Sequence, residues 1–201
     1  MSNSQANDLS PLFSRRKVPA LRIPLAGGGA FDLARETPQR FTLIVFYRGL
    51  HCPICKAQLK DLEAKLGEFA KRGVSVVAIS SDAKDRGEKA KTDWGLANLR
   101  VGYGLDLRVA RFWGLYISSG RGMTSVGIEE PRLFSEPALY LVRPDGTLYF
   151  GSVQTMPFAR PHFADILSAI DYVVAKDYPA RGEVMIVPND VSPRKTEEAN
   201  A

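Results

Sequence analysis

Residues 41–55 read FTLIVFYRGLHCPIC, and this stretch decides the fold. Its first part, Phe41–Tyr47, is an apolar run rich in β-branched and aromatic residues, which predicts a buried strand. Its last four residues, Cys52–Cys55, form a CxxC motif that holds the only two cysteines of the 201 residues. A strongly helical stretch, Lys56–Arg72, comes next. The motif therefore stands where a strand passes into a helix.

The residues after the motif predict a βαβ unit. Leucines and a phenylalanine recur at steps of three and four from Leu59 to Phe69, which makes one apolar helix face, and Gly73 ends the helix. Residues 74–79 predict a second strand. We expect the two strands to be parallel, because a crossover helix connects them.

Turn signals and periodicity predict the remaining elements. We expect a hairpin of residues 21–25 and 30–33 around Gly27–Gly29, a polar helix over 82–93, a short strand near 99–101, a helix over 107–115, a long polar loop over 117–136, a hairpin of 138–142 and 147–150, and a helix over 161–176. This order predicts a thioredoxin-like α/β fold. A central mixed sheet is flanked by helices and carries an N-terminal hairpin extension.

The chain divides into one domain with two extensions. Residues 1–17 predict a flexible arm, 18–178 the thioredoxin-like domain, and 179–201 a C-terminal extension that is disordered from about residue 188. The net charge is +5, but basic and acidic residues are interleaved, which argues against nucleic-acid binding. We see no secretory signal and no apolar run of membrane-spanning length, so we expect a cytoplasmic protein that does not bind membranes.

The position of the motif predicts thiol chemistry. Pro53 suits the first helical position, which makes Cys52 the N-cap and puts Cys55 at the third helical position. An N-cap thiolate can accept the amide hydrogen of Ile54 or Cys55, and the positive end of the helix lowers its pKa. We therefore expect Cys52 to attack a substrate and Cys55 to resolve the product. Three neighbours add positive or titratable charge: Arg48, His51 and Lys56.

Other interpretations remain open from the residues alone. The pair can be two buried structural thiols, or half of a zinc site that His51 and His162 complete, although no second CxxC is present. His51 either tunes the thiolate or points to solvent. His162 is expected at the surface or as a helix cap. We expect no metal and no cofactor.

Residues 46–55 and the strand before them resemble the AhpC/TSA peroxiredoxin-like family, and the resemblance extends over residues 20–175. In that family an aromatic pair leads into Pro-x-x-x-Thr-x-x-Cys, whose last cysteine attacks peroxide. In this register Arg48 takes the place of the proline and Cys52 that of the threonine. The resemblance thus implies that Cys55 is the peroxidatic cysteine.

The family's activating arginine would fall near Pro137, so this chain lacks it there. Arg48 is the expected replacement for the lost charge. A proline at this place is typical of thioredoxin-like oxidoreductases, where a cis-proline packs against the CxxC and leaves backbone atoms free for a substrate. The resemblance therefore implies a cis Glu136–Pro137 bond beside Cys52 and Cys55, with the 117–136 loop bordering the cleft.

These observations favour a thiol-dependent oxidoreductase with an antioxidant role, which reduces disulfides or peroxides through a Cys52–Cys55 dithiol–disulfide cycle. The first alternative is a peroxidase in which Cys55 attacks and Cys52 resolves. A non-enzymatic alternative is a binding module whose CxxC is incidental or holds metal. The expected partners are a peroxide or disulfide substrate, a small thiol or a thioredoxin- or glutaredoxin-type electron donor, and a second copy of the chain in a homodimer.

Overall fold

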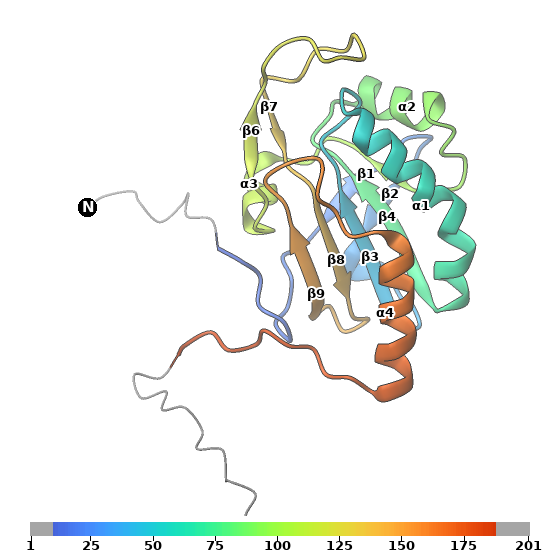
Figure 1. Ribbon diagram of the computed structural model, residues 1–201, viewed down its shortest axis with the longest axis vertical. Helices are drawn as coiled ribbons and strands as arrows, with labels where there is room; N and C mark the ends of the chain where they lie inside the picture. Colours follow the sequence, from blue (N-terminus) through green and yellow to red (C-terminus); the bar gives the residue numbers. More distant parts are fainter. Residues whose placement is uncertain (1–9, 188–201) are drawn as a thin grey trace, which may run out of the picture.

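The computed structural model describes residues 10–187, and a five-stranded mixed sheet forms the centre of the molecule (Figure 1). The strand order is β5 (Val101–Gly102), β4 (Val74–Ile79), β3 (Phe41–Phe46), β8 (Ala138–Val142), β9 (Leu148–Val153). β3 pairs in parallel with β4 and antiparallel with β8. Every residue of β3 is buried, because strands and covering layers surround it on all sides. The predicted βαβ unit and mixed sheet are confirmed.

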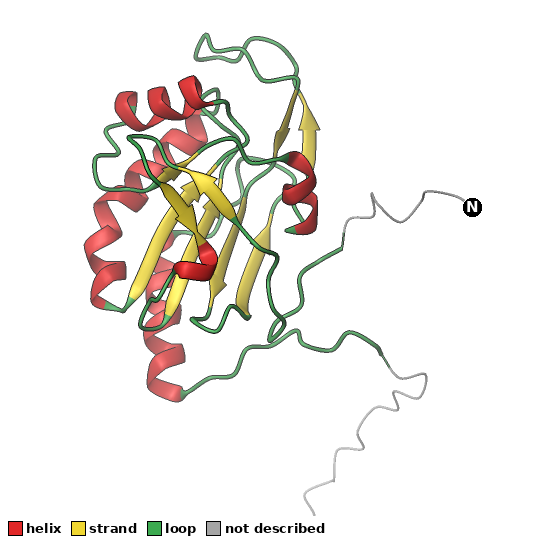
Figure 2. Cartoon of the chain, turned by 180° about the vertical axis from the view of Figure 1, so that it is seen from behind, coloured by secondary structure: helices red, strands yellow, loops and turns green. Residues whose placement is uncertain are grey.

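Each face of the sheet has its own apolar layer, since successive strand residues point to opposite faces. On one face, Leu43 and Val45 pack in a cluster with side chains of α1 (Pro53–Lys71) and α4 (Phe163–Lys176). On the other face, Ile44 and Phe46 pack against the β1–β2 hairpin and Trp113, which follows α3. Figure 2 shows this hairpin lying across the face opposite α1 and α4.

The smaller elements complete the expected order. β1 (Arg22–Pro24) and β2 (Ala30–Asp32) pair antiparallel around three glycines with positive φ, and a 3₁₀ turn, η2 (Leu33–Arg35), follows them. The remaining helices are α2 (Lys84–Asp93) and α3 (Leu107–Phe112). Among the described residues, no helix has both the length and the apolarity that crossing a bilayer requires.

The segment 117–136 is not a loop throughout, as expected, but contains a second hairpin. β6 (Ile117–Ser119) pairs antiparallel with β7 (Leu133–Ser135), and the residues between them project from the domain (Figure 1). Each strand has only three residues, which is too short for an alternating pattern to stand out in the sequence. The hairpin lies next to the sheet because β7 runs almost directly into β8.

The described part of the N-terminal segment is paired with β9. The Arg15 amide donates to the Leu148 carbonyl (2.8 Å), and the Leu148 amide donates to the Arg16 carbonyl (2.8 Å). The expected flexible arm over residues 1–17 is therefore held to the sheet edge from about Arg15 onward. Its first nine residues, and the disorder expected from residue 188, lie outside the described residues.

The expectation of a cis-proline is wrong. Within residues 10–187 every peptide bond is trans, including Glu136–Pro137. The chain runs extended from β7 into β8, with the Glu136 amide bonded to the Tyr116 carbonyl (2.8 Å), and a trans bond keeps this direction. The Pro137 carbonyl accepts the Gln154 amide (2.9 Å), so this backbone oxygen is engaged within the sheet rather than free for a substrate.

Candidate active site

Cys52 caps the first turn of α1, as its position before Pro53 predicts. Its backbone is extended (φ −102°, ψ 104°), and its Sγ accepts the amide hydrogen of Cys55 at 3.2 Å. Hydrogen bonds from the Cys55 thiol and amide, together with the charge of Arg160, lower the pKa of Cys52 to about 6, although burial opposes this. Cys52 is therefore mostly a thiolate at neutral pH.

Cys55 lies one turn deeper and has the opposite tendency. Its side chain is fully buried, and burial raises the pKa of the Cys55 thiol well above its ordinary value, with the neighbouring Cys52 adding to the effect. Both cysteines are free thiols in this structure. At neutral pH the pair therefore combines a thiolate at Cys52 with a protonated thiol at Cys55, which suits a nucleophile and a resolving group.

Arg160 is the cation that reaches the sulfurs, and the sequence analysis missed it. It comes from the loop between β9 and α4, and its Nη2 lies 3.2 Å from Cys55 Sγ and 3.8 Å from Cys52 Sγ. Its Nη1 donates to Gln58 Oε1 on α1. No local pattern marks this arginine, because it stands 105 positions from Cys55 and only the packing of the fold brings them together.

Arg48 was expected to supply the missing positive charge, but its side chain is engaged elsewhere. It forms ion pairs with Glu130 (Nη2–Oε1, 3.1 Å) and Glu136 (Nε–Oε2, 3.4 Å), and its guanidinium lies over the Phe134 ring at 4.6 Å. All three charged side chains are largely buried. Two carboxylates thus offset its single charge, and its influence on the pKa of Cys52 is the smallest of the named causes.

The titratable neighbours of the motif contribute little positive charge. His51 is buried against the Phe134 ring (4.7 Å) rather than facing solvent, and burial is the main cause that lowers the pKa of His51 to about 4. Its imidazole is therefore neutral at pH 7. Lys56 is exposed on α1, and His162 precedes α4 without a side-chain cap bond. His162 takes no part in the cysteine cluster.

A buried aspartate shapes the loop that leads to Cys52. Asp82 follows β4, and its carboxylate accepts the Leu50 amide (2.6 Å) and the Arg86 guanidinium (2.8 Å). Gly49 lies so close that a Cβ there would sit 2.6 Å from Asp82 Oδ2, and its φ of +139° also favours glycine. Because parallel strands end at the same sheet edge, the loops after β3 and β4 meet here.

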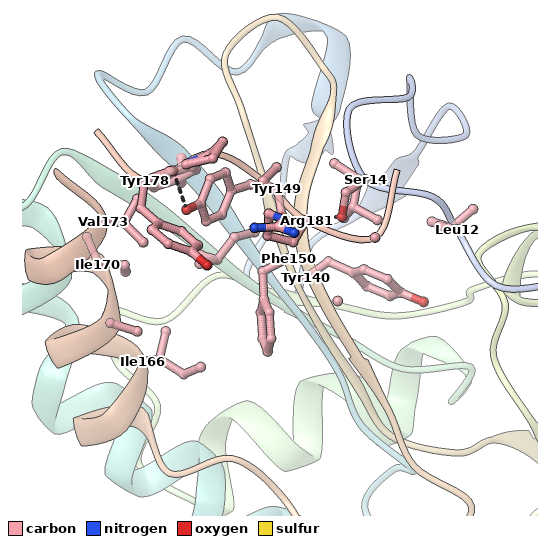
Figure 3. Close-up of a pocket in the computed structure, with 18 of the residues that line it drawn as sticks. Leu12, Ser14, Tyr140, Tyr149, Phe150, Ile166, Ile170, Val173, Tyr178 and Arg181 are labelled. Carbon is pink, nitrogen blue, oxygen red and sulfur yellow. Dashed lines mark hydrogen bonds between the residues drawn. The ribbon is translucent and has the colours of Figure 1, made fainter. Parts of the chain in front are cut away.

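A large cavity lies elsewhere in the molecule. It has a volume of about 590 Å³ and is formed by β9, α4 and the segments around Ser14 and Tyr178 (Figure 3). Aromatic residues, including Tyr149, Phe150 and Tyr172, line much of it, and neither cysteine does. The cysteine pair is instead packed into the protein interior, with Cys52 only 1% exposed.

Known proteins resemble this chain in sequence and in fold. The putative peroxiredoxins MT2597 and Rv2521 of Mycobacterium tuberculosis are 32% identical over 108 residues, which cover 50% of this chain. The chain spans 62% of the length of these curated relatives. Peroxidoxin BcpB from the same organism superposes with a TM-score of 0.63 at 17% identity, covering 81% of this chain and 98% of its own.

Further solved structures agree on the fold. The reduced 2-Cys peroxiredoxin of Plasmodium vivax superposes with a TM-score of 0.66 at 16% identity, covering 83% of this chain and 84% of its own. These similarities confirm the thioredoxin-like α/β fold. The model of the AhpC/TSA family matches residues 15–150, which is more than half of the sequence. The chain therefore belongs to the AhpC/TSA family, a family of thiol-dependent oxidoreductases.

Proposed function

We propose that this protein is a thiol-dependent peroxidase in which Cys52 attacks the peroxide and Cys55 resolves the product. The observation that carries this proposal is the arrangement at the start of α1. The Cys52 sulfur accepts the Cys55 amide while the Arg160 guanidinium lies beside both sulfurs. A helix N-terminus and a cation both stabilise a thiolate, the reactive form of cysteine.

The proposed cycle needs no metal or cofactor. The Cys52 thiolate attacks one peroxide oxygen, the O–O bond breaks, and the other oxygen leaves with a proton as water or an alcohol. Cys52 is thereby oxidised to the sulfenic acid. The Cys55 sulfur then attacks the Cys52 sulfur, and the hydroxyl group leaves with the Cys55 proton as water, which forms the disulfide. Two electrons and two protons from a small thiol or a thioredoxin- or glutaredoxin-type donor restore the dithiol.

Burial of the sulfurs favours a small oxidant over a protein disulfide. Cys52 is 1% exposed and Cys55 is fully buried, so another protein's disulfide cannot approach either sulfur without rearrangement. The trans bond before Pro137 and its engaged carbonyl also remove the expected docking site for a substrate strand. Disulfide exchange therefore becomes the weaker of the two redox activities. A metal-binding role is disfavoured because a guanidinium already lies beside both sulfurs.

One observation supports a second candidate, in which Cys55 is the attacking cysteine. Arg160 Nη2 lies closer to Cys55 Sγ (3.2 Å) than to Cys52 Sγ (3.8 Å). The family register also puts the peroxidatic position at Cys55. Against this candidate, burial raises the pKa of Cys55 well above its ordinary value, so the thiolate is scarce at neutral pH. We therefore prefer Cys52 as the nucleophile.

Trapping the sulfenic acid tests the assignment. Reduced wild-type protein, Cys52→Ser and Cys55→Ser are mixed with hydrogen peroxide at pH 7 by stopped flow, with dimedone present, and the adduct is located by mass spectrometry. We expect Cys55→Ser to carry the adduct on Cys52 and Cys52→Ser to react about 100-fold more slowly, because its remaining thiol is protonated. Wild-type protein should lose two hydrogens as it forms the disulfide.

Two outcomes contradict the proposal in different ways. Rapid oxidation of Cys52→Ser with the adduct on Cys55 supports the second candidate. No reaction of any variant with peroxide, together with efficient reduction of an insulin disulfide by the wild type, supports disulfide exchange. Because the cycle begins from a dithiol, we propose a reducing compartment such as the cytoplasm as its location.

A further inference from the structure

Gln58 is the residue that connects Arg160 to α1. It follows Cys55 by three positions, so both side chains lie on the same side of the helix. Gln58 Oε1 accepts a hydrogen bond from Arg160 Nη1 at 2.5 Å, while Arg160 Nη2 points to the sulfurs. The guanidinium is a rigid plane, so an anchor on one terminal nitrogen also sets the direction of the other.

The anchor is uncharged. Within residues 10–187, no carboxylate lies within ion-pair distance of Arg160, whereas Arg48 has two such partners. A glutamate at position 58 would hold the same nitrogen with a stronger, charge-assisted bond. Its negative charge, however, would disfavour a thiolate at the nearby sulfurs. An amide supplies direction to the guanidinium without this opposing charge.

We propose that Gln58 is a positioning residue, which aims the Arg160 guanidinium at the Cys52 and Cys55 sulfurs and leaves its positive charge available to them. This role rests on the proposed function, in which a thiolate is the attacking species. It does not require any contact between Gln58 and the peroxide.

The test measures the pH dependence of Cys52 alkylation in the reduced, full-length protein. Iodoacetamide reacts with the thiolate, and mass spectrometry of the peptide that contains both cysteines locates the label. Three variants are compared with the wild type: Gln58→Glu, Gln58→Met and the control Ala57→Glu. Ala57 is exposed on the same turn, so the control adds an equal charge on the neighbouring residue.

We expect Gln58→Glu to raise the alkylation midpoint of Cys52 by about one pH unit, since an adjacent opposite charge typically shifts a pKa by that order. Gln58→Met should also raise it, because the guanidinium loses its anchor, while Ala57→Glu should change it much less. The role is overturned when Gln58→Glu shifts the midpoint no further than Ala57→Glu, or when Gln58→Met matches the wild type. Near-UV circular dichroism checks folding, and where Gln58→Glu does not fold, Gln58→Met decides.

Peroxide consumption, measured in parallel, separates this inference from the proposed function. A wild type that consumes no peroxide, combined with a raised midpoint in both Gln58 variants, overturns the peroxidase assignment and supports the positioning role. A wild type that reduces peroxide, combined with unchanged midpoints in both Gln58 variants, supports the peroxidase and overturns the role of Gln58.

Discussion

Arg48 and Arg160 both stand near the CPIC motif, but their surroundings give them different roles. Arg48 precedes the motif by four positions, and its charge is shared with Glu130 and Glu136. Arg160 lies 105 positions from Cys55, and it has a neutral anchor, Gln58, and two sulfurs as partners. The comparison teaches that a cation activates a thiol through the charge left after its other neighbours are counted.

The region of Arg48 joins two parts of the fold. Its guanidinium bridges the loop before Cys52 and the end of the β6–β7 hairpin, where Glu130 and Glu136 lie. Phe134 packs against both Arg48 and His51. The Glu136 carboxylate also accepts the Ser118 hydroxyl (2.6 Å). These contacts indicate that Arg48 stabilises the structure around the motif, whereas Arg160 acts on the sulfurs.

The largest expected effect is on stability at Arg48. Arg48→Met leaves two buried carboxylates without their cation, and breaking a buried ion pair in this way costs about 3–5 kcal/mol. Urea unfolding should show this loss in the free energy of unfolding. The double variant Arg48→Met/Glu130→Gln should recover part of it, because it removes one of the unpaired charges. A loss below about 1 kcal/mol in the single variant would mean that these ion pairs behave like exposed ones.

The next effect is on reactivity at Arg160. Arg160→Met removes the cation beside the sulfurs, so the pKa of Cys52 should rise by about two units and the thiolate fraction at pH 7 should fall about tenfold. Stopped-flow oxidation by peroxide should slow at least as much, and Arg160→Lys should retain part of the rate. In folded Arg48→Met the alkylation midpoint of Cys52 should move less. Equal midpoints in the two methionine variants would break the comparison.

The smallest effect is a slope in stability with pH. The pKa of Cys52 is about 6 in the folded protein and near 8.5 in an unfolded chain, so the unfolded chain binds more protons between these values. This contribution is therefore present above about pH 8.5 and is lost as the pH falls through 6. Unfolding measured from pH 5.5 to 8.5 should show the slope in wild type minus Cys52→Ser, a difference that cancels other groups such as His51. The slope should shrink in the Arg160→Met background and persist in the Arg48→Met background.

Local patterns predicted most of the fold. The apolar run of β3, the leucine spacing of α1 and the glycines of the β1–β2 turn each reflect nearest-neighbour chemistry, and their structures followed. The expectations that were wrong depended on distant contacts. Pro137 is trans because β7 and β8 continue in one direction, and the β6–β7 hairpin forms from strands too short to show a pattern.

The candidate site divides in the same way. The sequence by itself determined that Cys52 caps a helix and that Cys55 lies one turn inside it, because Pro53 favours the first helical position and the capping contact spans three residues. Only the tertiary structure decided which arginine meets the sulfurs. Arg160 and Gln58 come together because α4 packs beside α1 on one face of the sheet, whereas Arg48 is drawn to two carboxylates that the β6–β7 hairpin brings next to it.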